Sequence, residues 1–150
     1  MSKKDILCDI DGTLANPEHR LGLIATRPKN WKGFFDASIN DPVYEDIAWL
    51  VRSLHNLGNN ILIVTARPEN NREITEKWLR DKALLEGFYK KMYMREAGDY
   101  RDDSIVKEEI LAQIRADGYN PYMVLDDRDR VCAMWRKLGI RCLQVKPGDF

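Results

Sequence analysis

This sequence of 150 residues has little of what secreted, zinc-binding or membrane proteins require. Its three cysteines, Cys8, Cys132 and Cys142, show no CxxC spacing and lie in apolar segments, which indicates buried reduced thiols. Neither His19 nor His55 adjoins a cysteine, so a structural zinc site is not expected. No apolar run is long enough to span a membrane, and no apolar leader precedes the first short apolar run. We therefore expect a cytoplasmic protein with no membrane partner.

The chain also lacks an excess of charge of either sign. Its 24 lysines and arginines balance 24 aspartates and glutamates. Because non-specific binding to duplexes is driven by a broad positive field, any contact with nucleic acid must be local. Hydrophobic residues make up 44% of the chain and charged residues 32%, which is ordinary for a globular protein of one domain. We expect a single domain over residues 1–150.

Short apolar runs alternate with amphipathic stretches along the whole chain. The runs that read as strands are residues 6–9, 61–64, 89–94, 122–125 and 140–145. Helical periodicity covers residues 69–83, 106–114 and 131–138, and one further helix is expected to begin with Asp41 as its N-cap and Pro42 in its first turn. This alternation predicts an α/β fold, a three-layer doubly wound parallel sheet with helices on both faces.

The first apolar run ends in two acids. With a strand period of two, Asp9 and Asp11 leave the strand on the same side, at the edge where open parallel sheets hold ligands. Two carboxylates this close repel each other. A bound divalent cation could offset their charge, or one acid could carry a proton while the other stays ionised. Gly12 frees the turn and Thr13 adds a hydroxyl. Taken alone, Asp-Gly also fits a simple hairpin turn.

Charged and polar residues follow the other strands too. Thr65 and Arg67 end the second, where a hydroxyl and a guanidinium suit phosphate, although an ordinary helix start fits equally. Asp126 and Asp127 end the fourth, which favours metal coordination. Lys107 lies in the first turn of a helix, where a cation is unusual. It suits phosphate, but local evidence favours a solvated lysine paired with a neighbouring acid.

Residues 15–41 form an irregular insertion directly after the first two acids. Trp31, Phe34 and Phe35 lie close together in this insertion. The cluster fits three interpretations: a small satellite core, a lid over the acids, or a surface on which a base stacks. Arg20 is either a ligand for substrate phosphate or a solvated loop charge.

Taken together, these motifs resemble those of a known superfamily. Asp-Ile-Asp-Gly-Thr at residues 9–13, Thr65, Lys107 and Asp126-Asp127 are similar to the four signatures of haloacid dehalogenase phosphatases, whose fold is Rossmannoid. The likeness is closer to the 3'-phosphatase domain of bacteriophage polynucleotide kinase-phosphatases, and it includes residues 65–67, 95–99, 103–110, 126–128, 134–136 and 148–150. The chain has no GxxxxGK[ST] motif, so the kinase half is not part of this resemblance.

The resemblance implies roles for particular residues. Asp9 would be the nucleophile, and Asp11 would protonate the leaving oxygen and then activate water. Mg²⁺ would be held by Asp9, Asp11 through its backbone carbonyl, and Asp127, with Asp126 in support. Thr65 and Lys107 would hold the phosphoryl oxygens. The residues expected to serve the substrate are Arg67, Arg95, Asp103 and Arg20.

Three functions remain open on the sequence. The first is a Mg²⁺-dependent phosphatase acting on 3'-phosphate ends of DNA or RNA through an aspartyl-phosphate. The second is a phosphatase of nucleoside monophosphates or other small phosphate esters, and the third is a noncatalytic phosphate-binding module or a subunit of a split kinase. An open groove lined by Arg67, Arg95 and Arg101 would favour a polynucleotide end, and a closed lid would favour a small ester. The expected partner is a phosphorylated nucleic-acid end or a nucleotide.

Overall fold

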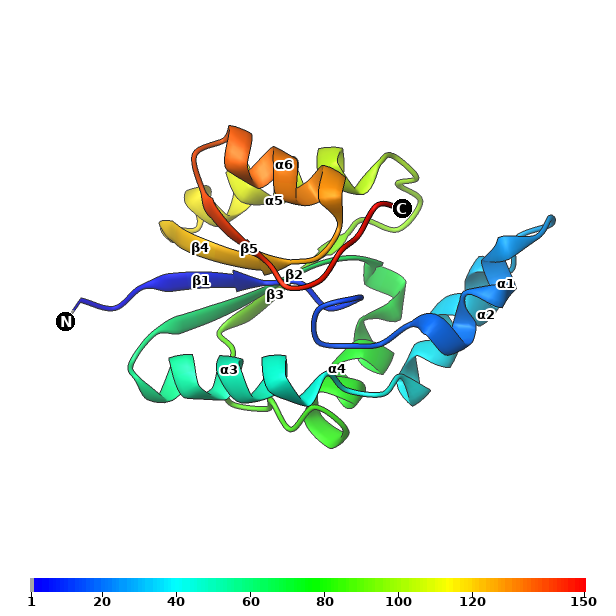
Figure 1. Ribbon diagram of the computed structural model, residues 1–150, viewed down its shortest axis with the longest axis horizontal. Helices are drawn as coiled ribbons and strands as arrows, with labels where there is room; N and C mark the ends of the chain where they lie inside the picture. Colours follow the sequence, from blue (N-terminus) through cyan, green and yellow to red (C-terminus); the bar gives the residue numbers. More distant parts are fainter. Residues whose placement is uncertain (1) are drawn as a thin grey trace.

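The computed structural model of the protein describes residues 2–150. Its centre is one five-stranded sheet in the order β3-β2-β1-β4-β5, in which every neighbouring pair is parallel (Figure 1). The strands are β1 (Asp5–Cys8), β2 (Asn60–Pro68), β3 (Lys91–Arg95), β4 (Pro121–Asp126) and β5 (Arg141–Gln144). Because the strands are parallel, all five of their carboxyl ends lie at one edge of the sheet.

Helices cover both faces of this sheet. The helices α3 (Glu45–Asn56) and α4 (Arg72–Asp81) pack on one face, and α5 (Asp103–Ala116) and α6 (Asp129–Lys137) pack on the other (Figure 1). The predicted three-layer α/β architecture is therefore confirmed. None of the helices within residues 2–150 is long and apolar enough to cross a membrane.

The central strand β1 shows why the sheet is covered on both faces. Ile6 and Cys8 belong to the apolar core beneath α3 and α4, while Leu7 between them belongs to the core beneath α5 and α6. Successive side chains of a strand point to opposite faces, so a continuous apolar run requires cover on both sides. All three cysteines are free and buried, as their apolar surroundings predicted.

The insertion after β1 forms a lobe, defined here as residues 18–40, that stands off from the sheet (Figure 1). It contains no strand and consists of η1 (Glu18–Arg20), α1 (Gly22–Ala25), α2 (Trp31–Asp36) and η2 (Ala37–Asn40). The expectation of an excursion outside the sheet is confirmed, but the segment is not irregular, because it forms these four short helical elements.

The predicted helix start at Asp41 is wrong. The helix α3 begins at Glu45, after Tyr44, and the carboxylate of Asp41 caps no helix. It is instead buried and accepts hydrogen bonds from Arg20 and Arg67. A local Asp-Pro pattern is typical of an N-cap, but two distant guanidinium groups satisfy this carboxylate in place of backbone amides.

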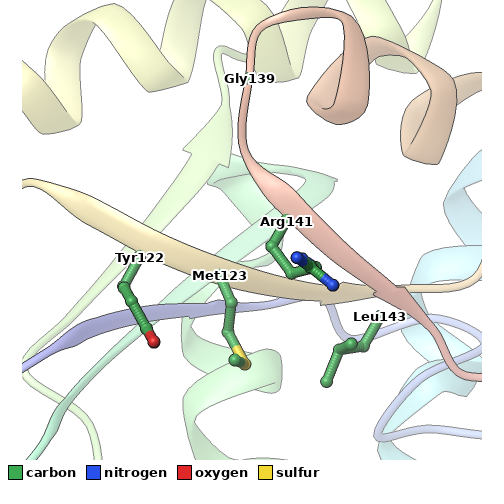
Figure 2. A pocket seen from close by; sticks show the side chains of 5 residues that line it. All are labelled: Tyr122, Met123, Gly139, Arg141 and Leu143. Atoms are coloured by element: carbon green, nitrogen blue, oxygen red, sulfur yellow. The ribbon is translucent and has the colours of Figure 1, made fainter.

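A hollow of about 430 Å³ lies beside β4 and β5, lined by Tyr122, Met123, Gly139, Arg141 and Leu143 (Figure 2). Its lining contains no carboxylate, histidine or cysteine. The acidic, basic and hydroxyl side chains that could take part in catalysis gather elsewhere, at the carboxyl ends of the strands.

Candidate active site

Three buried carboxylates meet where β1 and β4 end. Cys8 pairs with Leu125 across these neighbouring strands, so Asp9 and Asp126 follow at the same level, and Asp127 comes next in the chain. One oxygen from each of the three lies within 4.8 Å of the others. Each residue is at most 5% exposed. The parallel register therefore brings together acids that are more than a hundred positions apart in the sequence.

Lys107 from α5 reaches into this cluster. Its Nζ donates to Asp9 Oδ1 at 2.9 Å and to Asp126 Oδ2 at 2.8 Å, and the residue is 2% exposed. Burial would lower the pKa of Lys107, but Asp126 and Asp9 raise it well above its ordinary value, so the ammonium stays charged. The interpretation as a solvated lysine, which local evidence favoured, is wrong. The position at the start of a helix is explained by the two acids that the side chain reaches.

One lysine does not balance three carboxylates. Burial and the nearby Asp126 raise the pKa of Asp9, although Lys107 opposes this shift, and burial likewise raises the pKa of Asp127. Asp127 Oδ2 is buried and has no hydrogen-bond partner among the described residues. A buried charged oxygen without a partner is costly, and a divalent cation bound by carboxylate oxygens would remove that cost. The donor set therefore fits Mg²⁺.

The backbone at Gly12 makes room for this arrangement. A Cβ placed there would lie 2.0 Å from Asp127 Oδ2, and its φ of +86° lies in the region that favours glycine. Only a residue without a side chain lets the turn after β1 approach the carboxylate of Asp127 this closely. Thr13 Oγ1 in the same turn donates to Asp9 Oδ2 at 3.1 Å.

Asp11 lies apart from the acid cluster and has its own cations. Its carboxylate accepts from Arg20 Nη2 at 2.6 Å and from Arg67 Nη2 at 2.7 Å, and its side chain is 31% exposed. Burial would raise the pKa of Asp11, but Arg67 and Arg20 outweigh it and lower the pKa to about 2. The carboxylate of Asp11 is not among the three clustered acids, so its contact with a metal ion stays a prediction for the backbone carbonyl.

Arg20 and Arg67 are both buried, each 1% exposed. Arg20 also donates to both oxygens of Asp41, and Arg67 donates to Asp41 Oδ2 at 3.2 Å and to Thr75 Oγ1 at 3.2 Å. The interpretation of Arg20 as a solvated loop charge is therefore wrong. Arg67 lines no open groove in this arrangement, and a contact of either arginine with substrate remains a prediction.

Asp41 is the residue of this site that sequence reasoning missed. It joins the arginine of the lobe to the arginine of β2, and it also contacts His19 Nε2 at 2.7 Å. The carboxylate of Asp41 is fully buried, so its two arginines are its main compensation. Its sequence context, Asp before Pro, pointed to a helix cap and carried no signal of this role.

The remaining candidates lie near the same edge of the sheet. Thr65 is 1% exposed in β2, and its hydroxyl accepts from the backbone N–H of Arg67 at 3.1 Å. Arg95 at the end of β3 donates to Asp103 Oδ1 at 2.5 Å, and Arg128 donates to Asp103 Oδ2 at 2.7 Å. The structure thus brings most of the predicted residues together in one group around Asp9, one around Asp11 and one around Asp103, while Thr65 has no hydrogen bond to these three acids among residues 2–150.

A parallel sheet with helices on both faces and buried acids at its carboxyl edge is the architecture of haloacid dehalogenase-like hydrolases. The fold matches a hydrolase from Streptococcus pneumoniae TIGR4 with a TM-score of 0.65 at 14% identity, over 98% of this chain and 95% of that one. The family of phosphatase domains of polynucleotide kinase PNKP matches residues 3–150. The chain belongs to this family and is accordingly a phosphoric monoester hydrolase by class.

Two relatives in larger proteins are similar to nearly the whole chain. Pnkp1, solved in a complex with Rnl and Hen1, is 30% identical with a TM-score of 0.79, and the match covers 100% of this chain and 48% of Pnkp1. A protein of Autographa californica nuclear polyhedrosis virus, assigned as a bifunctional polynucleotide kinase/RNA ligase, is 26% identical over 136 residues, which are 90% of this chain and 18% of that protein. The chain therefore spans less than half the length of either relative.

Proposed function

We propose that this protein is a Mg²⁺-dependent phosphatase that removes the phosphate from the 3' end of a polynucleotide through an aspartyl-phosphate on Asp9. One observation carries the proposal, the carboxylate of Asp9 held by Lys107 beside the carboxylates of Asp126 and Asp127. The family of PNKP phosphatase domains, to which the chain belongs, supports a polynucleotide end as the substrate.

Asp9, Asp127 and the backbone carbonyl of Asp11 would hold Mg²⁺, with Asp126 in support. The bound ion would offset the negative charge of the carboxylates and of the phosphate, which would otherwise repel each other. Asp126 already has its own partners, since its Oδ2 accepts from Lys107 and from Trp135 Nε1 and its Oδ1 accepts from the backbone of Asp127. These bonds orient Asp126 and leave Asp127 Oδ2 free for the ion.

In the first step an oxygen of Asp9 attacks phosphorus, and the bond from phosphorus to the 3' oxygen breaks. The 3' oxygen leaves with a proton from Asp11, and Lys107 and Thr65 hold the equatorial oxygens of the phosphoryl group. In the second step Asp11 takes a proton from water, which attacks phosphorus and releases phosphate and the carboxylate of Asp9. Asp11 thereby regains the proton that it gave to the 3' oxygen, so the two steps together balance.

The two arginines that contact Asp11 favour the second step, in which it acts as a base, and oppose the first, in which it donates a proton. With its pKa held at about 2, Asp11 is a carboxylate, as the water-activating step requires. Donation of a proton requires a weaker hold by Arg20 or Arg67. A substrate phosphate is an anion that competes for the same guanidinium groups, so binding of substrate would supply that change.

A phosphatase of nucleoside monophosphates is the second candidate. The neutral net charge of the chain and the burial of Arg67 favour a small substrate, because neither offers long-range attraction to a polynucleotide. The third candidate, a noncatalytic module, is disfavoured because the nucleophile, the acid and the metal-ligating carboxylates are all present.

The test measures phosphate release with Mg²⁺ and with EDTA from 3'-phosphorylated oligonucleotides, 5'-phosphorylated oligonucleotides and mononucleotides. The proposal expects Mg²⁺-dependent release with the highest kcat/KM on the 3'-phosphorylated oligonucleotide. A preference for mononucleotides would replace it with the second candidate. Absence of release from all three substrates would support the noncatalytic module.

A further inference from the structure

The lobe carries an exposed tryptophan and unpaired cations that the chemistry at Asp9 does not use. Resting on the proposed phosphatase function, we infer that Trp31, with Lys29 beside it and Arg27 in the same exposed segment, forms a binding surface for the single strand that leads to the phosphorylated end. The nucleotides behind the scissile phosphate stack on the indole and place their phosphates near the two cations.

Trp31 presents a supported aromatic surface. It is 45% exposed, and its ring stacks on Phe35 with centroids 5.9 Å apart and an interplanar angle of 21°. It also meets the edge of Phe34 at 5.8 Å. A tryptophan backed by two other rings keeps its orientation while part of it stays open to solvent. Such a ring suits a nucleic-acid base, because every base has a flat face for stacking and a tryptophan side chain loses little conformational entropy on binding.

The lobe connects this surface to the reaction centre. The guanidinium of Arg20 lies 4.3 Å from the ring centroid of Phe34, and Arg20 Nη1 donates to the carbonyl of Phe34. The same guanidinium donates to Asp11 at 2.6 Å. Trp31 is therefore separated from the proposed acid and base by only two intervening side chains. A strand that delivers its end to Asp9 passes the indole within its first few nucleotides.

The charge of the lobe suits a polyanion. The lobe contains Arg20, Arg27, Lys29 and Lys32 against Glu18 and Asp36, so it carries two net positive charges and the rest of this neutral chain carries two net negative charges. Lys32 pairs with Asp36, but no ion pair among residues 2–150 involves Arg27 or Lys29. Lys29 Nζ lies 5.6 Å from the centroid of Trp31. The exposed Arg101, by contrast, is already paired with Asp99 and Glu109.

These features favour nucleic acid over a membrane or a protein as the occupant. Basic side chains interleaved with an exposed aromatic ring are the pattern of single-strand binding surfaces. Because the lobe has a net positive charge and the rest of the chain a net negative one, the strand is expected to follow the lobe.

Binding is measured by fluorescence anisotropy with a short 5'-fluorescein oligonucleotide that ends in a 3' hydroxyl, as DNA and as RNA. Trp31→Ala is expected to weaken binding about 10-fold, the loss typical of one stacked base. Its control is Trp49→Ala, a tryptophan on α3 that is 63% exposed and lies outside the lobe.

A double variant, Arg27→Glu with Lys29→Glu, is expected to lower the slope of log affinity against log salt by about 1.4. Its control is Arg115→Glu with Lys137→Glu, two exposed cations in the last turns of α5 and α6.

Turnover separates this inference from the proposed function. The lobe variants are expected to lose more kcat/KM on a 3'-phosphorylated oligonucleotide than on p-nitrophenyl phosphate, and the ratio of the two should fall about 10-fold. The inference would be overturned if the lobe variants bound and turned over oligonucleotides as well as the control variants do. That result is expected if the lobe binds a protein instead. A wild-type protein that releases no phosphate from any substrate would reject the proposed function, and the anisotropy series would still decide the role of the lobe.

Discussion

Lys107 Nζ lies 2.9 Å from Asp9 Oδ1, although 98 positions separate the two residues in the chain. The pair is buried, with side-chain exposures of 3% and 7%. It joins the helix α5 to the end of β1 and fixes the carboxylate that we propose as the nucleophile. A second carboxylate only two residues away, Asp11, is held by different cations, Arg20 and Arg67. The two acids of one turn therefore have separate environments and can carry separate roles.

Asp9→Asn is expected to abolish phosphate release while leaving the protein folded. The amide keeps the shape of the side chain but removes the nucleophilic oxygen, so kcat should fall by at least about 10³-fold. Phosphate release and far-ultraviolet circular dichroism measure the two properties. Asp5→Asn, at the start of the same strand, is the matched control and should keep its activity. Retained turnover in Asp9→Asn would remove Asp9 from its role.

Mg²⁺ is expected to stabilise the folded protein. At a concentration 100 times its Kd, one bound ion adds about 2.7 kcal/mol, which raises the Tm of a chain of this size by roughly 5–10 °C over the value in EDTA. Differential scanning calorimetry measures the shift. Asp127→Asn should abolish it, because the buried oxygen without a partner is lost, whereas Glu73→Gln on the surface of α4 should keep it. A shift of equal size in Asp127→Asn would place the ion elsewhere.

Lys107→Met is expected to destabilise the protein in a pH-dependent way. Loss of the cation leaves Asp9 and Asp126 buried without compensation, at a cost of about 3–5 kcal/mol at neutral pH. Burial and Asp126 already raise the pKa of Asp9, and removal of Lys107 raises it further. A carboxyl whose pKa is raised by folding is destabilising above that pKa, so the loss should shrink as the pH falls and Asp9 takes up a proton.

Urea denaturation of Lys107→Met and wild type between pH 7 and pH 5 measures this effect. Lys137→Met, in the last turn of α6, is the control and should change little at either pH. An equal loss at both pH values would show that packing, and not charge, accounts for the effect of Lys107→Met.

Arg20→Ala is expected to lower the free energy of unfolding by about 3–5 kcal/mol. Arg20 and Asp41 are both fully buried, and removal of the arginine leaves the carboxylate with one guanidinium fewer. The variant should also raise the pKa of Asp11, because Arg20 helps to hold it at about 2. Urea denaturation tests the first effect, with Arg27→Ala in the exposed part of the lobe as the control. A stability equal to that of Arg27→Ala would show that Arg67 alone satisfies Asp41.

The local signals of this sequence were sufficient for the fold and for the position of the acids. An apolar run that stops at a carboxylate marks a strand end, and this signal needs only neighbouring residues. It placed Asp9 after β1 and Asp126 and Asp127 at the end of β4. Because carboxyl ends of parallel strands share one edge, alternation of strands and helices was enough to predict that these acids converge.

Only the tertiary structure decided which cationic side chain forms an ion pair with which acid. Lys107 reads locally as a solvated helix residue, Arg20 as a loop charge and Asp41 as a helix cap, and all three are buried ion-pair partners. Arg67 and Asp11 are 56 positions apart, and Arg20 and Asp41 are 21 apart. Long flexible side chains find partners according to register, packing and desolvation, which act across such distances. The sequence by itself determined the strands, the helices and the edge where the acids meet, and the packing of the lobe and α5 against that edge determined how their charges are balanced.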